Sequence, residues 1–128
     1  MKILVVDDAQ VQRFITIKML TELGYTDIIG CSSAEEAVIQ LKDVEINLIL
    51  SDLHMGGANG LWLLEYVRNN KMFSSIPFIM ITSDHEKKMV LQALKLGLQN
   101  YLFKPVLKPD LASKLRDLSA KFNFQPPQ

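Results

Sequence analysis

Apolar residues along this chain alternate between two patterns: short continuous runs, and longer segments in which they recur every three or four residues. The runs are rich in β-branched residues and nearly uninterrupted, which is typical of strands covered on both faces of a parallel sheet. We expect strands at 2–7, 26–31, 47–52, 77–82 and 100–103. The segments with helical spacing predict helices over 10–23, 33–42, 60–69, 85–97 and 110–122. Strand and helix therefore alternate along the whole chain.

The helical segments also predict which side chains face the sheet. In the last helix the apolar residues step by four, three and four, and so share one face: Leu111, Leu115, Leu118 and Phe122. Similar stripes are Val11, Phe14, Ile15, Met19 and Leu23 in the first helix, Ala34, Ala37, Val38 and Leu41 in the second, and Met89, Val90, Ala93 and Leu94 in the fourth. Helix boundaries are indicated by a capping serine, Ser32 or Ser33, and by Gly24 and Gly97, which can end helices in a left-handed conformation.

A strand and helix repeat of this size predicts an α/β domain with one core. The chain has 128 residues, too few for the usual eight-stranded barrel of about 250 residues. A doubly wound parallel sheet with right-handed crossovers is the remaining common arrangement. The final Gln-Pro-Pro-Gln cannot pack as helix. We therefore expect one domain over 1–122, and a tail or the start of a linker over 123–128.

Composition narrows the classes of partner. The 14 lysines and arginines balance the 14 aspartates and glutamates, which argues against a nucleic-acid partner. The first apolar run is too short for a signal peptide, and no run approaches the roughly 20 residues of a membrane span. A soluble, cytoplasmic protein without a membrane partner is expected. Cys31 is the single cysteine, so an internal disulfide is excluded, and we interpret it as a small buried apolar residue instead of a reactive thiol.

Four of the apolar runs stop on polar residues, and these endings are the main clue to function. They are Asp7-Asp8, Asp52, Thr82-Ser83 and Lys104. The carboxyl ends of neighbouring parallel strands lie along one edge of a sheet, where open α/β folds build binding sites. Each ending alone has a structural explanation, since aspartate and serine cap helices or shape turns and lysine meets solvent. Unrelated capping choices, however, would not need to supply the set that phosphoryl transfer requires.

The chemistry of that set is specific. Asp7, Asp8 and Asp52 offer the hard oxygen ligands that Mg²⁺ prefers. Lys104 can hold the charge of a transferring phosphoryl group, and the Thr82 hydroxyl can donate a hydrogen bond to it. Asp52 ends a different strand from the aspartate pair and is the candidate nucleophile. Crowded carboxylates raise one another's pKa, whereas Lys104 and a bound divalent ion oppose that shift, so phosphorylation is expected to require the metal.

From Lys2 to about Phe122 the chain resembles a receiver domain of two-component response regulators. The motifs that carry the resemblance are Asp7-Asp8, Asp52 with Met55 and Gly60, Thr82-Ser83, and Tyr101 with Lys104-Pro105. The resemblance implies a flavodoxin-like (βα)5 fold with strand order 2-1-3-4-5. It also implies a cis peptide bond between Lys104 and Pro105, whereas the residues alone favour trans.

The same resemblance implies a signalling switch and not an enzyme that turns over an external substrate. Asp52 would be the phosphoacceptor, with a sensor histidine kinase, a phosphotransfer protein or acetyl phosphate as the donor. Mg²⁺ would be bound by Asp7, Asp8, Asp52 and the backbone carbonyl of His54. Thr82 and Lys104 would bind the phosphate and couple it, with Tyr101 as the switching aromatic, to the face formed by the fourth helix, the fifth strand and the fifth helix. The downstream target is unknown, and the protein would be a monomer or a weak homodimer.

Two departures from the family pattern lie after Asp52. Family members commonly carry proline where this chain has Gly56, and a bulky residue where it has Ala58. The loop from Gly56 to Gly60 is therefore expected to be more mobile. His54 and Asp84 each lie two residues beyond a site residue, where they either tune the lifetime of the phosphoryl group or are ordinary surface residues, and we expect His85 on the surface of a helix.

Other functions compete with the switch. A metal-dependent phosphohydrolase would commonly need a second acid two residues beyond the nucleophile, where this chain has His54. A nucleotide-binding module would need the spacing Gly-x-Gly-x-x-Gly, which the cluster from Gly56 to Gly60 does not follow. A receiver that binds its partner without being phosphorylated is the third alternative. All the residues that the chemistry requires are present.

Overall fold

The computed structural model describes residues 1–83, 87–98 and 100–122. Its strands are β1 (Lys2–Val6), β2 (Asp27–Cys31), β3 (Leu48–Asp52), β4 (Phe78–Thr82) and β5 (Asn100–Phe103). Its helices are α1 (Gln10–Glu22), α2 (Ala34–Asp43), α3 (Gly60–Asn69), α4 (Lys87–Lys95) and α5 (Lys108–Phe122). The predicted boundaries agree to within about two residues. The expected start of the fourth helix, Asp84, His85 and the tail over 123–128 lie outside the described residues.

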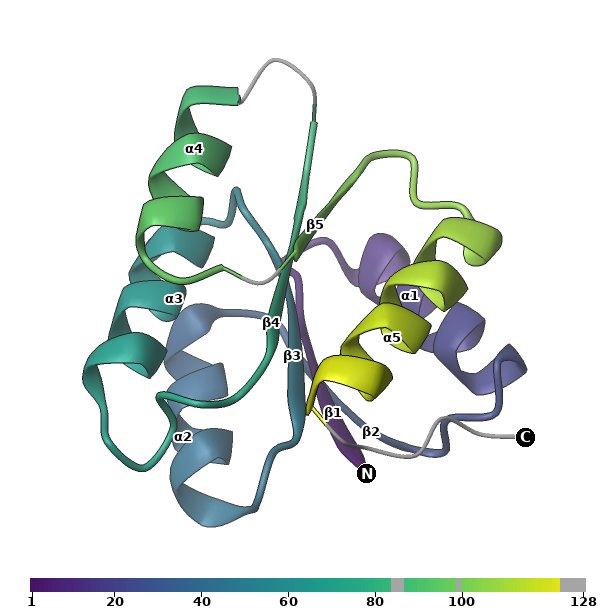
Figure 1. Ribbon diagram of the computed structural model, residues 1–128, viewed down its shortest axis with the longest axis horizontal. Helices are drawn as coiled ribbons and strands as arrows, with labels where there is room; N and C mark the ends of the chain where they lie inside the picture. The colour runs from purple at the N-terminus through teal and green to yellow at the C-terminus, as the bar shows by residue number, and fades with distance from the viewer. Residues whose placement is uncertain (84–86, 99, 123–128) are drawn as a thin grey trace.

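The strands form one parallel sheet in the order β2-β1-β3-β4-β5, which confirms the predicted doubly wound arrangement. Helices α1 and α5 cover one face, and α2, α3 and α4 cover the other (Figure 1). Because every neighbouring pair of strands is parallel, all five carboxyl ends lie at one edge of the sheet. That edge carries the polar endings identified in the sequence.

The strands divide the core into two clusters, since successive side chains point to opposite faces. One cluster packs under α1 and α5 and takes Ile3, Val5, Leu48, Leu50, Ile79 and Ile81 from the strands. The other packs under α2, α3 and α4 and takes Leu4, Val6, Ile49, Phe78 and Met80. Every residue of β3 and β4 is buried, which explains why these strands read as continuous apolar runs in place of an alternating pattern.

The predicted helix boundaries have the expected capping contacts. Ser33 is the N-cap of α2, and its hydroxyl accepts a hydrogen bond from the Glu36 amide. The Glu36 carboxylate in turn accepts bonds from the amide and the hydroxyl of Ser32, so amide donors at the helix start are satisfied. Gly24 and Gly97 adopt φ angles of 100° and 92° after α1 and α4, as predicted.

The predicted apolar stripe of α1 is wrong for three of its five members. Val11, Phe14 and Ile15 are 73%, 66% and 39% exposed, whereas Thr16 and Leu20 are the buried residues of this helix. Thr16 can be buried because its hydroxyl donates to the Gln12 carbonyl at 3.1 Å. The stripe of α4 is wrong at one position, since its remaining members pack against the core but Leu94 is 42% exposed.

The stripes of α2 and α5 are confirmed within the described side chains. Ala34, Ala37 and Leu41 are buried and Val38 packs against the core. Leu111, Leu115 and Leu118 are buried as well. Among the described residues, no helix has both the length and the apolar character needed to cross a membrane.

The single cysteine is buried in the core. Cys31 is 2% exposed, and burial raises the pKa of its thiol to about 11, with the Glu36 carboxylate contributing. It is thus the inert, buried cysteine that the sequence predicted.

Arg68 of α3 donates to the carbonyls of Gly97, Ser74 and Ile76, and burial lowers the pKa of its guanidinium. Arg68 ties the loop before β4 to the end of α4.

Candidate functional site

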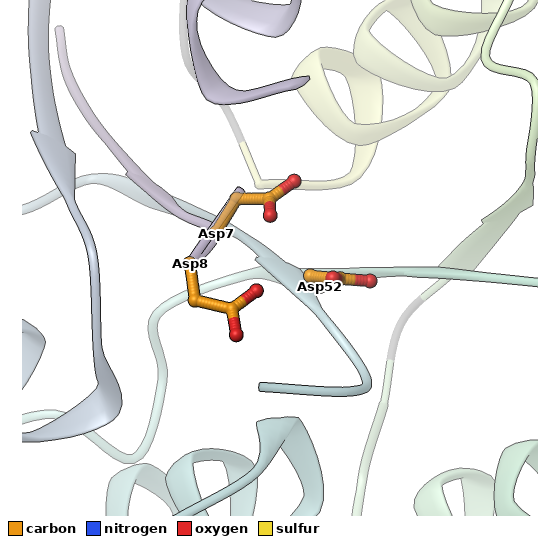
Figure 2. Close-up of side chains that lie close together, drawn as sticks. All are labelled: Asp7, Asp8 and Asp52. Carbon is orange, nitrogen blue, oxygen red and sulfur yellow. The ribbon is translucent and has the colours of Figure 1, made fainter. Parts of the chain in front are cut away.

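Three carboxylates meet at the carboxyl edge of the sheet. Asp7 and Asp8 follow β1, and Asp52 is the last residue of β3 (Figure 2). The register pairs Val6 with Ser51, so the two strand endings come together directly. One carboxylate oxygen from each of the three residues lies within 4.8 Å of the others. The predicted convergence of these side chains is therefore observed.

Asp7 is the buried member of the cluster, at 2% exposure. Its Oδ1 accepts a hydrogen bond from the Ala9 amide at 2.9 Å, while its Oδ2 is buried without a hydrogen-bond partner among the described residues. Burial raises the pKa of Asp7; the Ala9 amide lowers it, the Asp52 charge raises it, the Lys104 charge lowers it and the Asp8 charge raises it. An unsatisfied buried carboxylate oxygen beside two further carboxylates has the chemistry of a hard cation site.

Asp52 and Lys104 form an ion pair across the site. The Nζ of Lys104 lies 2.9 Å from Oδ1 of Asp52, which is 5% exposed. The Lys104 amide also donates to the Thr82 carbonyl at 2.7 Å, which joins the ends of β4 and β5. The alternative that Lys104 only meets solvent is therefore wrong. The Lys104–Pro105 peptide bond is cis, as the resemblance implied.

Thr82 occupies the same edge from β4. It follows Ile81, which pairs with Asp52 in the sheet register, and it is 1% exposed. Its hydroxyl lies 3.5 Å from the Ser83 carbonyl, a distance at which a hydrogen bond is weak. Two carboxylate-bearing strand ends, a hydroxyl and an amine thus come from β1, β3, β4 and β5. The capping alternative for the aspartate pair is not observed, because no side chain caps α1.

The loop from β3 to α3 is fixed at several points. Gly60 donates from its amide to the Leu53 carbonyl, and a Cβ at this position would lie 2.5 Å from the Asp52 carbonyl oxygen, so only glycine fits. Gly57 has a φ of 82°. Asn59 caps α3 by accepting from the Trp62 amide at 2.9 Å. The mobility of the loop from Gly56 to Gly60 stays a prediction.

One contact of this loop reaches the acidic cluster. The Gly56 amide donates to Oδ2 of Asp8 at 2.9 Å. The sequence could not predict this bond, because it depends on the path of the loop and on a backbone donor that every residue except proline carries. The amide of Ala9, which holds Asp7, is equally invisible in the sequence.

The remaining predicted residues lie around this centre. His54 is exposed and follows Leu53, and its carbonyl as a metal ligand stays a prediction. Tyr101 of β5 is half-buried, packs against the core on the α4 side and meets Phe103 edge-on, with ring centroids 5.2 Å apart. Sequence reasoning missed Phe103, although residues two apart share a face of a strand.

Residues 3–116 match the family model described as the response regulator receiver domain. The chain is 38% identical over 119 residues to the chemotaxis protein CheY homolog of Campylobacter jejuni, covering 92% of both chains. It is 39% identical over 116 residues to the chemotaxis protein CheY1 of Helicobacter pylori, covering 90% of this chain and 94% of the relative. The structure of chemotaxis protein CheY4 from Vibrio cholerae superposes with a TM-score of 0.83 at 23% identity, over 91% of this chain and 96% of that one, which supports the fold alone.

The fold and the site agree with this family match: the parallel sheet has the order β2-β1-β3-β4-β5, and an acidic cluster and a lysine lie at its carboxyl edge. This chain belongs to the response regulator receiver domain family, and within it to the chemotaxis-like members. Members of this family are signalling proteins.

Proposed function

We propose that this receiver domain is a phosphoacceptor switch in which Asp52 accepts a phosphoryl group. The donor would be a sensor histidine kinase, a phosphotransfer protein or a small phosphodonor such as acetyl phosphate. The observation that carries the proposal is the pairing of Asp52 with Lys104 at 2.9 Å, in the same carboxylate cluster as Asp7, whose Oδ2 is buried without a hydrogen-bond partner among the described residues. The pair supplies a nucleophile and a cation at one point.

The donor set fits Mg²⁺. Asp7, Asp8 and Asp52 each offer one carboxylate oxygen within 4.8 Å of the others, and the carbonyl of His54 would complete the protein ligands. When bound, the ion would neutralise charge on the carboxylates and on the phosphoryl oxygens. Burial and its two carboxylate neighbours raise the pKa of Asp7, so a cation would favour its ionised form.

The reaction uses the side chains of this chain in distinct roles. A carboxylate oxygen of Asp52 attacks the phosphorus atom; an oxygen–phosphorus bond forms while the bond to the leaving group breaks. With phosphohistidine the leaving imidazole nitrogen keeps the electron pair and takes a proton, and with acetyl phosphate acetate leaves. Lys104 moves from pairing the free carboxylate to pairing the phosphoryl oxygens, and the Thr82 hydroxyl donates to another of them.

The phosphorylated state would be transmitted through Thr82 and Lys104. Their backbones are joined by the hydrogen bond from the Lys104 amide to the Thr82 carbonyl, so a shift of either residue displaces the ends of both β4 and β5. Tyr101 lies on β5 and would change its packing against the α4 side of the core. The altered face of α4, β5 and α5 would then control a downstream protein.

The direct test is incubation with acetyl phosphate and Mg²⁺, read by intact mass spectrometry. Wild type is expected to gain the mass of one phosphoryl group, and Asp52→Asn is expected to gain none. Asp27→Asn is the matched control, because Asp27 is exposed and pairs with Lys2 at the opposite edge of the sheet. Removing the metal with a chelator is expected to abolish labelling.

Labelling of Asp52→Asn to the wild-type level would disprove the assignment of the acceptor. Labelling that persists at an unchanged rate without a divalent ion would disprove the role of the metal. Steady release of phosphate from varied esters would instead favour the hydrolase alternative.

A further inference from the structure

Gly56 makes a contact that connects the loop after β3 to the residue after β1. Its amide donates to Oδ2 of Asp8 at 2.9 Å across a sequence separation of 48 residues. The other two carboxylates of the cluster are held by different groups, Asp7 by the Ala9 amide and Asp52 by the Lys104 amine. Each carboxylate therefore has its own anchor, and the anchor of Asp8 is Gly56.

Asp8 depends on such an anchor because it is exposed. Asp7 and Asp52 are 2% and 5% exposed, so packing restricts their side chains, whereas Asp8 lies on the surface. A carboxylate has two oxygens and about four acceptor positions. A bond to one oxygen restrains the group and leaves further acceptor positions on the carboxylate, one oxygen of which lies within 4.8 Å of carboxylate oxygens of Asp7 and Asp52. Partners that orient a ligand in this way raise metal affinity.

We propose that Gly56 is a positioning residue for the cation site, acting through its amide on Asp8. The inference rests on the proposed Mg²⁺ site and adds a residue to it. Because coupling between two events is reciprocal, occupation of the site also favours the loop conformation in which Gly56 is bonded. The loop continues to Gly60, which is packed on the Asp52 carbonyl, and so the start of α3 is coupled to the metal.

The local geometry allows a clean pair of substitutions. Gly56 is not among the glycines with positive φ, and a Cβ there would lie 3.8 Å from Oδ2 of Asp8, an ordinary contact. Alanine therefore fits and keeps the amide donor. Proline at the same position has no N–H to donate. Gly56→Ala tests the loss of glycine's flexibility alone, whereas Gly56→Pro also removes the amide donor and fixes φ.

The experiment is calorimetric titration of Mg²⁺ into wild type, Gly56→Ala and Gly56→Pro, with urea unfolding in the absence of metal to verify the fold. Gly56→Ala is expected to bind within about twofold of wild type. Gly56→Pro is expected to bind about threefold to tenfold more weakly, less than the 10- to 100-fold typical of orienting partners because Asp8 is exposed.

Equal affinities in all three proteins would overturn the role of Gly56 and leave the metal site standing. Equal weakening in both variants would also overturn it, since the cause would then be the lost freedom of glycine. Failure of wild type to bind Mg²⁺ would overturn the metal site itself, and with it this inference.

A second measurement on wild type covers the case in which Gly56→Pro does not fold. Amide hydrogen exchange is followed by NMR with and without Mg²⁺, with the amide of Gly97 as an internal reference because it bonds to Leu94 at the end of α4. Exchange at Gly56 is expected to slow on adding Mg²⁺ while Gly97 is unchanged. Unchanged or faster exchange at Gly56 would overturn the coupling.

Discussion

Asp7 is a carboxylate that the fold removes from water while placing two other carboxylates beside it. Its Oδ1 is satisfied by the Ala9 amide, but its Oδ2 is buried without a hydrogen-bond partner in the described part of the chain. Burial, reinforced by Asp52 and Asp8, raises its pKa against the opposing effects of the amide and Lys104. Without a cation the folded state therefore holds the proton of Asp7 at a pH where the unfolded chain has lost it.

This shift predicts a pH dependence of stability in metal-free buffer. The contribution of Asp7 to the free energy of unfolding is expected to fall as pH rises from the ordinary aspartate value of about 3.9 through the raised pKa of folded Asp7, because this group binds its proton more tightly in the folded state. Asp7→Asn keeps an acceptor for the Ala9 amide and has no charge to titrate. This variant is expected to be more stable than wild type at pH 7. Its free energy of unfolding should also lack the part of the pH dependence that Asp7 causes.

Urea unfolding at a series of pH values checks both statements. Asp27→Asn is the control and should keep the wild-type profile in this range, since Asp27 lies at the opposite edge of the sheet. A variant Asp7→Asn that is less stable than wild type at neutral pH would contradict the prediction.

Sequence reasoning found the residues of the site but not what holds them. Asp52 and Lys104 could be predicted because each stands where an apolar run stops, and parallel strands bring such endings together. The bond from Gly56 to Asp8 and the unsatisfied oxygen of Asp7 depend on a loop path and on side-chain rotamers. No spacing of residue types encodes either.

Among the helices, α1 and α5 differ in how clearly the sequence marks their buried face. In α5 the apolar residues form one stripe with polar residues elsewhere, and Leu111, Leu115 and Leu118 are buried as predicted. The apolar residues of α1 lie on several sides of the helix, so its sequence offers more than one candidate for the buried face. Packing selects the one containing Leu20 and leaves Phe14 exposed.

The two stripes of α1 predict very different costs of truncation. Leu20→Ala removes a fully buried side chain and is expected to lower the free energy of unfolding by about 2–5 kcal/mol. Phe14→Ala removes a side chain that is 66% exposed and is expected to change it by less than about 0.5 kcal/mol. Urea unfolding compares the two, and a loss for Phe14→Ala as large as that for Leu20→Ala would contradict the assigned face.

For the whole molecule, the alternation of strands and helices could be predicted from periodicity, and the parallel sheet from continuous apolar runs, which the full burial of β3 and β4 explains. The order of the strands could not, because no local pattern states which strand lies beside which. The resemblance supplied that order, and the structure confirms it. The hydrogen bond from Arg68 to the Gly97 carbonyl after α4 could not be predicted either, since an arginine on a helix is usually a surface residue.

A site assembled only in the folded sheet predicts that Mg²⁺ stabilises the protein. The free energy of unfolding is expected to rise by about 1.4 kcal/mol at a metal concentration ten times Kd, because the unfolded chain does not bring Asp8 and Asp52 together. Urea unfolding followed by circular dichroism, at matched ionic strength with and without Mg²⁺, measures this. Asp8→Ala should lose most of the gain; an equal gain in that variant would place the binding elsewhere.

Trp62 is the single tryptophan of the chain; it lies in the first turn of α3, and its amide donates to the capping side chain of Asn59. The residue is 43% exposed, and its ring stacks on that of Tyr66 with centroids 5.7 Å apart. Indole emission from this protein therefore has one origin, at the point where the loop after Asp52 becomes helix. The chain carries its own optical reporter, and changes at that junction can be followed without attaching a dye.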